Sequence, residues 1–385
     1  MATSGVHRFD EWIRGRFRDL NTELEELYFA RGPGGPIRDA GLAQKGALYQ
    51  EGRELVSGLS ARGDDEELYD LLGNLGFYLA ACARHEVVEA GAEPGDQPAA
   101  VVAATIGARL GVAPRLLASH LMTHNAARDG RYRTFTRLRD ERVFLDVNTI
   151  SVFAYERAAH AVLRAAALGA SHPVTASLLA ASKAALAEVV LTNRRLVAEL
   201  DEERFFHNVR AYYKPHRVGP SVHRGPNAGD FAAISVLDVM LGLCPPTDPS
   251  YAQILLEKMP YLAPGDQSLL RRILGERSLM DAFLDQASSG AGEPQLKRNL
   301  ALFLDVCARH GQATNEHYET LIEKFIRRPN ERTPAGASQD NLTASGPPLS
   351  VVLASLEKLR DRRCARLREG VSTRYHDVQR LSSLL

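Results

Sequence analysis

The 385-residue sequence has no excess of charge, no long apolar run and no visible export signal. Its 47 Lys and Arg residues balance 47 Asp and Glu residues, so no net positive charge attracts the phosphates of nucleic acids. The most apolar stretch, residues 175–190, is rich in alanine and contains Ser and Lys, which does not suggest a membrane span. Charged residues interrupt the first 14 positions. We therefore expect a cytoplasmic protein that binds neither nucleic acid nor membrane.

Paired cysteines and the common catalytic motifs are missing as well. No GxSxG, HExxH, GxxxxGK[ST] or GxGxxG occurs, which argues against serine hydrolases, zinc proteases, P-loop enzymes and dinucleotide-binding folds. The cysteines have no CxxC spacing for zinc or redox chemistry, and they are typical of reduced cytosolic thiols. They are Cys82, Cys244, Cys307 and Cys364.

Strand patterns are scarce too. Apolar residues recur at helical spacing nearly throughout, whereas the alternation that marks β-strands is almost absent. The sequence therefore predicts an all-α fold, with Gly and Pro ending successive helices. The expected helices include 97–110, 114–128, 147–168, 174–200, 202–213, 230–243, 295–310 and 315–328.

Two segments do not fit the helical pattern. Residues 214–229 hold three prolines, three glycines and two histidines between two apolar helices, and long loops inside compact domains tend to be functional. Residues 329–348 are rich in proline and in small or hydroxyl residues. We expect this second segment to be either a mobile lid or a disordered linker.

Three of the twelve histidines stand in informative positions. His120 and His124 are four residues apart on an expected helix, where they could share a metal, but no third ligand stands nearby, and a polar helix face is the favoured interpretation. His317 shares a helix face with Leu321 and Phe325. Its position fits either a buried core histidine or a neutral imidazole projecting toward a haem.

Arg210 stands out because four aromatic residues surround it in the sequence, the pairs 205–206 and 212–213. A guanidinium held among rings can meet a carboxylate through two hydrogen bonds, while the rings form walls for a planar substrate. An ion pair between helices is the alternative explanation.

The order of motifs around Arg210 resembles the indoleamine 2,3-dioxygenase superfamily. In that superfamily two phenylalanines precede a substrate-carboxylate arginine, and a Gly-Ser-Ala-Gly loop and a Phe-Asp-Val-Leu-Leu-Gly helix follow. Here Phe205 and Phe206 precede Arg210, and they are followed by Asn-Ala-Gly at 227–229 and by Leu-Asp-Val-Met-Leu-Gly at 237–242. The closest resemblance is to the branch that contains monodechloroaminopyrrolnitrin synthase.

The resemblance covers roughly residues 97–328. Residues 257–264 are similar to the Met-Arg-Arg-Tyr-Met-Pro-Pro segment of that superfamily, and residues 110–117 resemble its approach to the distal haem helix. His317 falls where the proximal haem histidine is expected, after an inserted GQATN at 311–315. The resemblance implies a helical haem-binding catalytic domain at 111–385, preceded by a smaller helical region at 1–110.

The resemblance also implies roles for individual residues. His317 would be the axial ligand of haem b, with His310 as the alternative, and molecular oxygen or peroxide would be the co-substrate. Arg210 would hold the carboxylate of a tryptophan-like substrate against Phe205 and Phe206. The distal helix would turn three residues on one face toward the haem: Ala118, Leu121 and Asn125.

The loop at 227–229 completes the expected site. The backbone N–H groups of Asn227, Ala228 and Gly229 would donate to the reduced oxygen species, and the chain would oxidise or rearrange an aromatic amino acid or its derivative in a specialised biosynthesis. A non-catalytic helical binding protein or scaffold is the alternative. The sequence does not fix the oligomeric state.

Overall fold

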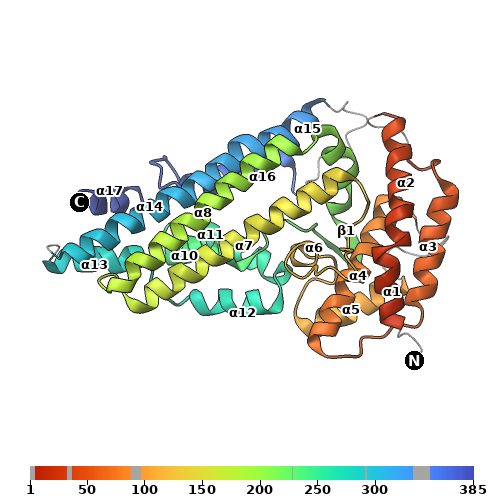
Figure 1. Ribbon diagram of the computed structural model, residues 1–385, viewed down its shortest axis with the longest axis horizontal. Helices are drawn as coiled ribbons and strands as arrows, with labels where there is room; N and C mark the ends of the chain where they lie inside the picture. Colours follow the sequence, from red (N-terminus) through yellow and green to blue (C-terminus); the bar gives the residue numbers. More distant parts are fainter. Residues whose placement is uncertain (1–4, 33–36, 88–96, 228, 291–292, 333–346) are drawn as a thin grey trace.

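The computed structural model describes residues 5–32, 37–87, 97–227, 229–290, 293–332 and 347–385. Within these ranges helices form most of the structure and the one sheet is a small β-hairpin, which confirms the all-α fold class. Figure 1 shows an elongated molecule with the N-terminal helices at one end and the C-terminus at the other. The first helices are α1 (Gly5–Arg14), α2 (Arg16–Ala30), α3 (Leu42–Val56), α4 (Asp65–Arg84), α5 (Pro98–Leu110) and α6 (Ala118–Leu121).

The remaining elements follow in chain order. The α-helices are α7 (Arg139–Leu168), α8 (Pro173–Glu199), α9 (Glu202–Arg204), α10 (Ala232–Met240), α11 (Pro249–Lys258), α12 (Pro264–Ile273), α13 (Leu279–Gly290), α14 (Pro294–Glu316), α15 (Arg328–Arg332), α16 (Leu349–Arg363) and α17 (Tyr375–Ser382). The other elements are the π-helices η1 (Phe205–Val209) and η4 (His317–Arg327), the 3₁₀-helices η2 (Arg210–Tyr213) and η3 (Met259–Tyr261), and the strands β1 (His216–Val218) and β2 (Ser221–His223).

Three long helices form the body of the molecule. In Figure 1, α7, α8 and α14 run side by side along the long axis, and α8 packs against both of the others. By length and apolarity α8 could cross a membrane, but 44% of its most apolar window is buried inside the fold. Since α8 contacts a helix on two sides, its apolar composition is that of a core helix.

The N-terminal helices pack on one large cluster of buried side chains. This cluster takes Phe9 and Phe17 from the first helices, and it also takes Phe205, Phe231 and Phe325 from far along the chain. This cluster includes residues from both sides of the predicted domain boundary between residues 110 and 111. The boundary itself stays a prediction. A second cluster fills the space among α7, α8, α10 and α14.

The expected helix at 114–128 is wrong. Only Ala118–Leu121 is helical, because the backbone leaves the α region at Met122, with φ −125° and ψ −86°. Asn125 then turns its amide toward backbone groups of Leu121 and Arg133. Asn competes in this way with helical hydrogen bonds, which explains why the apolar spacing was misleading.

The structure tests the prediction for only one of the two segments that lack a helical pattern. The segment at 214–229 is confirmed as non-helical, and it contains the hairpin β1–β2, whose tight turn uses Gly219 at φ +59°. The lid or linker expected at 329–348 lies largely outside the described residues, which end at Arg332 and resume at Pro347. Residues up to Arg332 continue the preceding helix as α15.

A buried ion pair joins the N-terminal helices to η1. Arg84 of α4 donates to both carboxylate oxygens of Glu25 of α2, at 2.8 and 2.9 Å, and also to the carbonyl of His207. Asn208 of η1 donates to Glu25 from the other side at 2.8 Å. Because Glu25 has no exposed side-chain surface, these donors hold its charge and fix η1 against α2 and α4.

Glu25→Ala should destabilise the fold strongly, because it leaves the buried Arg84 charge without a carboxylate. We expect the free energy of unfolding to fall by about 3–5 kcal/mol in a urea titration. Glu26→Ala is the matched control, since Glu26 is half exposed and pairs with Arg204 at the surface, and it should cost less than about 1 kcal/mol. Equal losses in the two variants would contradict the anchoring role of Glu25.

Candidate active site

The segment that holds the candidate residues, Phe205–Tyr213, is π-helical and then 3₁₀-helical instead of α-helical. Phe205 and Phe206 begin the π-helix η1, and Arg210 begins the 3₁₀-helix η2. The guanidinium of Arg210 lies 5.2 Å from the centre of the Phe206 ring. π-Helical turns are rare and are frequent at functional sites, so the local geometry singles out the same residues as the motif.

Phe205 connects this segment with the helix that carries His317. Its ring lies 4.8 Å from Phe144 of α7 and 5.7 Å from Phe325 of η4, between ring centres. η1 and η4 are therefore side by side, and both are π-helical. Phe144 also packs on Tyr213, at 5.8 Å, so four aromatic rings gather where the two segments meet.

His317 is the first residue of η4, which continues α14 without a break. Its side chain is exposed, while the protein around it desolvates the charged ring and lowers its pKa to about 4, with the positive charge of Arg363 as the second cause. The ring makes no hydrogen bond or ion pair with the residues that the structure describes, so its nitrogens are accessible to a ligand.

His310, the alternative ligand, has a different environment. Its side chain has no exposed surface, and its Nε2 bonds to the buried carboxylate of Asp238 at 2.8 Å. Its ring also packs edge-on against Tyr155 at 6.3 Å. Burial lowers its pKa, so the ring is neutral. Close packing leaves no room beside His310 for a planar macrocycle.

Two of the three predicted distal residues lie on a short helix, and the third lies beyond its end. Ala118 and Leu121 belong to the short α6 and are buried in the same cluster as Phe205. Asn125 is buried beyond the helix end and holds the backbone of Arg133. The predicted helical face shared by these three residues is therefore wrong, while their orientation toward a haem stays a prediction.

His120 and His124 do not form a metal site. Both rings pack on Tyr69, with ring centres 4.3 and 5.1 Å away, and His120 accepts a hydrogen bond from the backbone of Leu117. In the described ranges no group of three His, Cys, Asp or Glu side chains could hold a metal. A haem needs only one protein ligand, because the porphyrin supplies four nitrogens, so the open His317 ring fits a haem iron.

The loop at 227–229 is already tied by its own contacts. Asn227 donates its backbone N–H to Asp230 and accepts the N–H of Gly229 at its side-chain oxygen. Asp230 also receives two hydrogen bonds from Arg224, at 2.7 and 2.8 Å. Ala228, also expected to donate, lies outside the described residues. Two of the three amides would have to exchange partners before donating to a ligand.

Lys258 fixes the far end of the same loop. Its ammonium donates to the carbonyls of Gly229 and Phe231 and to the hydroxyl of Ser235, at 2.7–3.1 Å. Burial lowers the pKa of Lys258 to about 8. Three neutral acceptors therefore hold a desolvated cation, and they keep the loop against the start of α10.

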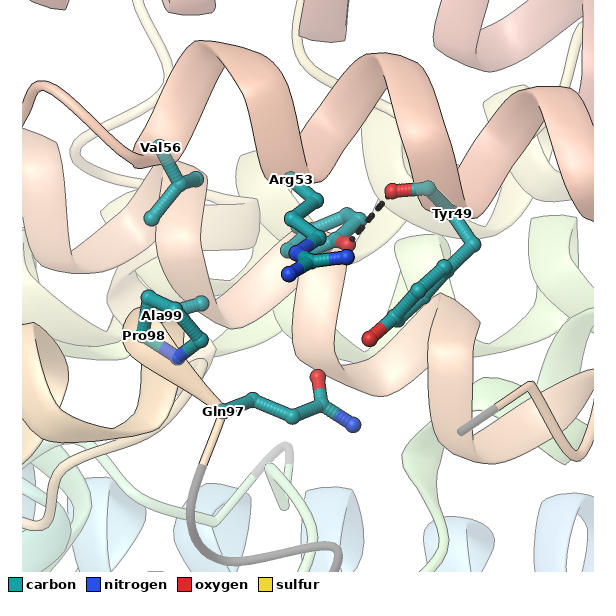
Figure 2. Close-up of a pocket in the computed structure, with 7 residues that line it drawn as sticks. Tyr49, Arg53, Val56, Gln97, Pro98 and Ala99 are labelled. Atoms are coloured by element: carbon teal, nitrogen blue, oxygen red, sulfur yellow. Dashed lines mark hydrogen bonds between the residues drawn. The ribbon is translucent and has the colours of Figure 1, made fainter. Parts of the chain in front are cut away.

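A small cavity elsewhere is too small to be the substrate site. Figure 2 shows it between α3 and α5, and its volume is about 10 Å³. This volume holds one water molecule and excludes an indole ring. The cavity is lined by Tyr49, Arg53, Val56, Tyr78, Gln97, Pro98 and Ala99.

One known protein family matches nearly the whole of this chain. The family described as Monodechloroaminopyrrolnitrin synthase PrnB matches residues 3–385, nearly the whole chain. The chain belongs to this family. The PrnB family is part of the haem oxygenase group that includes indoleamine 2,3-dioxygenase, which confirms the resemblance seen in the motifs.

Membership in the PrnB family establishes an oxidative enzyme and sets aside the non-catalytic scaffold. The family is haem-dependent and acts on a tryptophan-derived substrate in secondary metabolism. The match does not assign individual residues. For these, the structure supplies the environments described above.

Sequence reasoning missed several residues that shape the site. Phe144 completes the aromatic group, and an aromatic residue at helical spacing in α7 gave no signal of its own. Asp238 lies inside the motif at 237–242, and its polar side chain within an apolar helix was a usable signal. Arg363 gave none, because many arginines in this part of the chain lie at the surface.

The buried His85 should make stability depend on pH. It bonds to Tyr28, Asn21 and Tyr212, and burial, followed by the charge of Arg84, lowers its pKa well below 6.5. Below pH 6.5 His85 binds a proton in the unfolded chain but stays unprotonated in the folded protein. The free energy of unfolding therefore falls as the pH falls, by about 1.4 kcal/mol per pH unit.

This dependence can be isolated by comparing variants. Urea titrations between pH 7 and 5 should show a shallower loss of stability for His85→Gln than for the wild type. His7→Gln, which removes a half-exposed histidine, should keep the wild-type slope. A His85→Gln slope equal to that of the wild type would rule out a neutral buried His85.

Proposed function

We propose that this chain binds haem b through His317 and uses it to oxidise or rearrange a tryptophan-derived substrate held by Arg210. The observation that carries the proposal is the position of His317, whose accessible imidazole begins a π-helix that contacts the Phe205–Phe206 segment. The haem would supply activation of molecular oxygen or peroxide. The protein supplies the ligand, the substrate position and the exclusion of water.

His317 is preferred to His310 because the two rings have opposite environments. A proximal ligand must be neutral and must present a free nitrogen to open space. His317 meets both conditions, whereas the Nε2 of His310 is held by Asp238 and its ring is fully packed. His310 instead serves as a hydrogen-bond partner that keeps the Asp238 carboxylate in place.

Arg210 is suited to hold a substrate carboxylate. Its guanidinium lies against the Phe206 ring, and a planar guanidinium can meet a carboxylate through two hydrogen bonds. Phe205, buried between Phe144 and Phe325, forms the wall behind it. A carboxylate fixed at one end and a ring fixed at the other determine which substrate carbon faces the oxidant.

The remaining elements would enclose the substrate. Ala118 and Leu121 contribute small and apolar side chains to the same buried cluster, and the tied loop at 227–229 closes a side of the site. We assign the loop a shaping role, with its amides donating to a ligand only after their present contacts open. We also propose a cytoplasmic location, in keeping with four free cysteines.

His317→Ala should prevent the haem iron from binding with its wild-type protein ligand. We expect the haem-loaded wild type to show a Soret band that His317→Ala loses or shifts, because this variant lacks the imidazole that we assign as the ligand. His310→Ala is the control, and it should keep the wild-type Soret position even if it is less stable. A band lost only in His310→Ala would overturn the ligand assignment.

Arg210→Ala should weaken substrate binding without changing the haem. Loss of a two-point contact to a carboxylate predicts at least about a tenfold rise in the Kd for tryptophan, used as a probe and followed by the change in the Soret band, which corresponds to about 1.4 kcal/mol. Arg210→Lys should recover part of this loss. Decarboxylated tryptamine should bind wild type and Arg210→Ala equally, and a difference between them would refute the clamp.

A further inference from the structure

Arg115, three residues before α6, is a completely buried cation with part of its guanidinium unused. Its Nη1 donates to the backbone carbonyl of His223 at 2.9 Å, and its Nε donates to the carbonyl of Leu116 at 3.3 Å. Its Nη2 has no hydrogen-bond partner among the residues that the structure describes, and the residue has no exposed surface. Burial lowers the pKa of Arg115 to about 9, so the side chain still carries its charge at neutral pH. A buried charge with unused donors destabilises a fold unless a ligand pairs with it.

The backbone that carries Arg115 is held in place on three sides. A Cβ on Gly76 of α4 would clash with the backbone nitrogen of Leu116, and a Cβ on Gly107 of α5 would lie 2.8 Å from the carbonyl oxygen of Val112. The segment at 112–116 therefore lies directly against both helices. On its other side, the N–H of Ala113 donates to the carbonyl of Pro260 at 2.7 Å. The position from which the Arg115 side chain starts is thus fixed by the fold.

The loop after β2 collects more positive than negative charge. Residues 223–231 contain one carboxylate, Asp230, and Arg224 donates to both of its oxygens at 2.7 and 2.8 Å. Two further cations, Arg115 and Lys258, donate to backbone carbonyls of the same stretch. Neither of these two forms an ion pair with a carboxylate in the described part of the chain. The surroundings of this loop therefore suit a negatively charged ligand.

We propose that Arg115 is a further ligand-binding residue of the proposed site, and that its unused donors pair with a carboxylate group of the bound haem or substrate. The inference rests on the proposed function, which supplies the ligand. Haem b carries two propionate groups, and the substrate carboxylate is already assigned to Arg210. A planar guanidinium with both Nη2 hydrogens unpaired can meet such a carboxylate through charge-assisted hydrogen bonds. Because Nη2 is covered, the adjoining loop shifts when the ligand enters.

The test measures the Kd of haem b, followed by the Soret band, for the wild type, Arg115→Gln and Arg115→Lys. If Arg115 pairs with a propionate, Arg115→Gln should bind haem at least about tenfold more weakly. Arg115→Lys keeps the charge and should recover part of this loss. Haem dimethyl ester, whose propionates are blocked, should bind the wild type and Arg115→Gln equally. Arg109→Gln is the control, since Arg109 pairs with Asp65 at the surface, and it should match the wild type.

A second measurement detects pairing with the substrate carboxylate instead. In that case Arg115→Gln should bind haem as the wild type does, but its Kd for tryptophan should rise at least about tenfold. Its Kd for decarboxylated tryptamine should stay at the wild-type value. Either pattern supports a carboxylate partner for Arg115 and identifies the molecule that carries it.

Other outcomes overturn the inference. It fails alone if Arg115→Gln binds haem and tryptophan as the wild type does, or if the variant weakens haem and its dimethyl ester equally, as a purely structural residue would. A wild type that takes up no haem overturns the proposed function and the inference together. If Arg115→Gln does not fold, Arg115→Met removes the buried charge with a side chain of similar length, and it takes the same place in each comparison with the same tenfold effect expected.

Discussion

The ion pair between Arg84 and Glu25 is the contact on which the candidate site depends. It lies away from the reacting region, yet Arg84 and Asn208 carry its hydrogen bonds into η1, which begins with Phe205 and leads into Arg210. Burying these charges is favourable only while every donor and acceptor is matched. The position of the aromatic wall is therefore set by a polar network in the N-terminal helices.

A second buried ion pair fixes helices next to η4. Asp238 joins α10 to α16 through Arg363 and to α14 through His310. The two buried carboxylates, Glu25 and Asp238, each connect helices distant in the chain. These contacts tolerate little movement, which suits the proposed orientation of a planar substrate.

Sequence reasoning reached the fold class, the irregular loop at 214–229 and the grouping of Phe205 and Phe206 with Arg210. These follow from local signals, namely helical periodicity, Pro and Gly content and motif order. It failed at 114–128, where apolar spacing favours a helix but the Asn125 amide replaces the helical hydrogen bonds. Nor could it show that Arg363 pairs with the buried Asp238, because only the tertiary fold brings these two residues together. The environments that distinguish His317 from His310 are also tertiary.

The π-helix η4 has a consequence for how the chain length around His317 can change. A π-turn closes each hydrogen-bonded ring with one residue more than an α-turn. A helix pinned at both ends, here by Asn193 against Ala313 and by Lys324 against Val197, can absorb an added residue by widening its turns. The five residues GQATN stand directly before the His317 turn. Insertions and deletions in this helix would then rotate the imidazole of His317 about the helix axis while the flanking contacts stay in place, so the direction of this side chain can change in evolution without a change of fold.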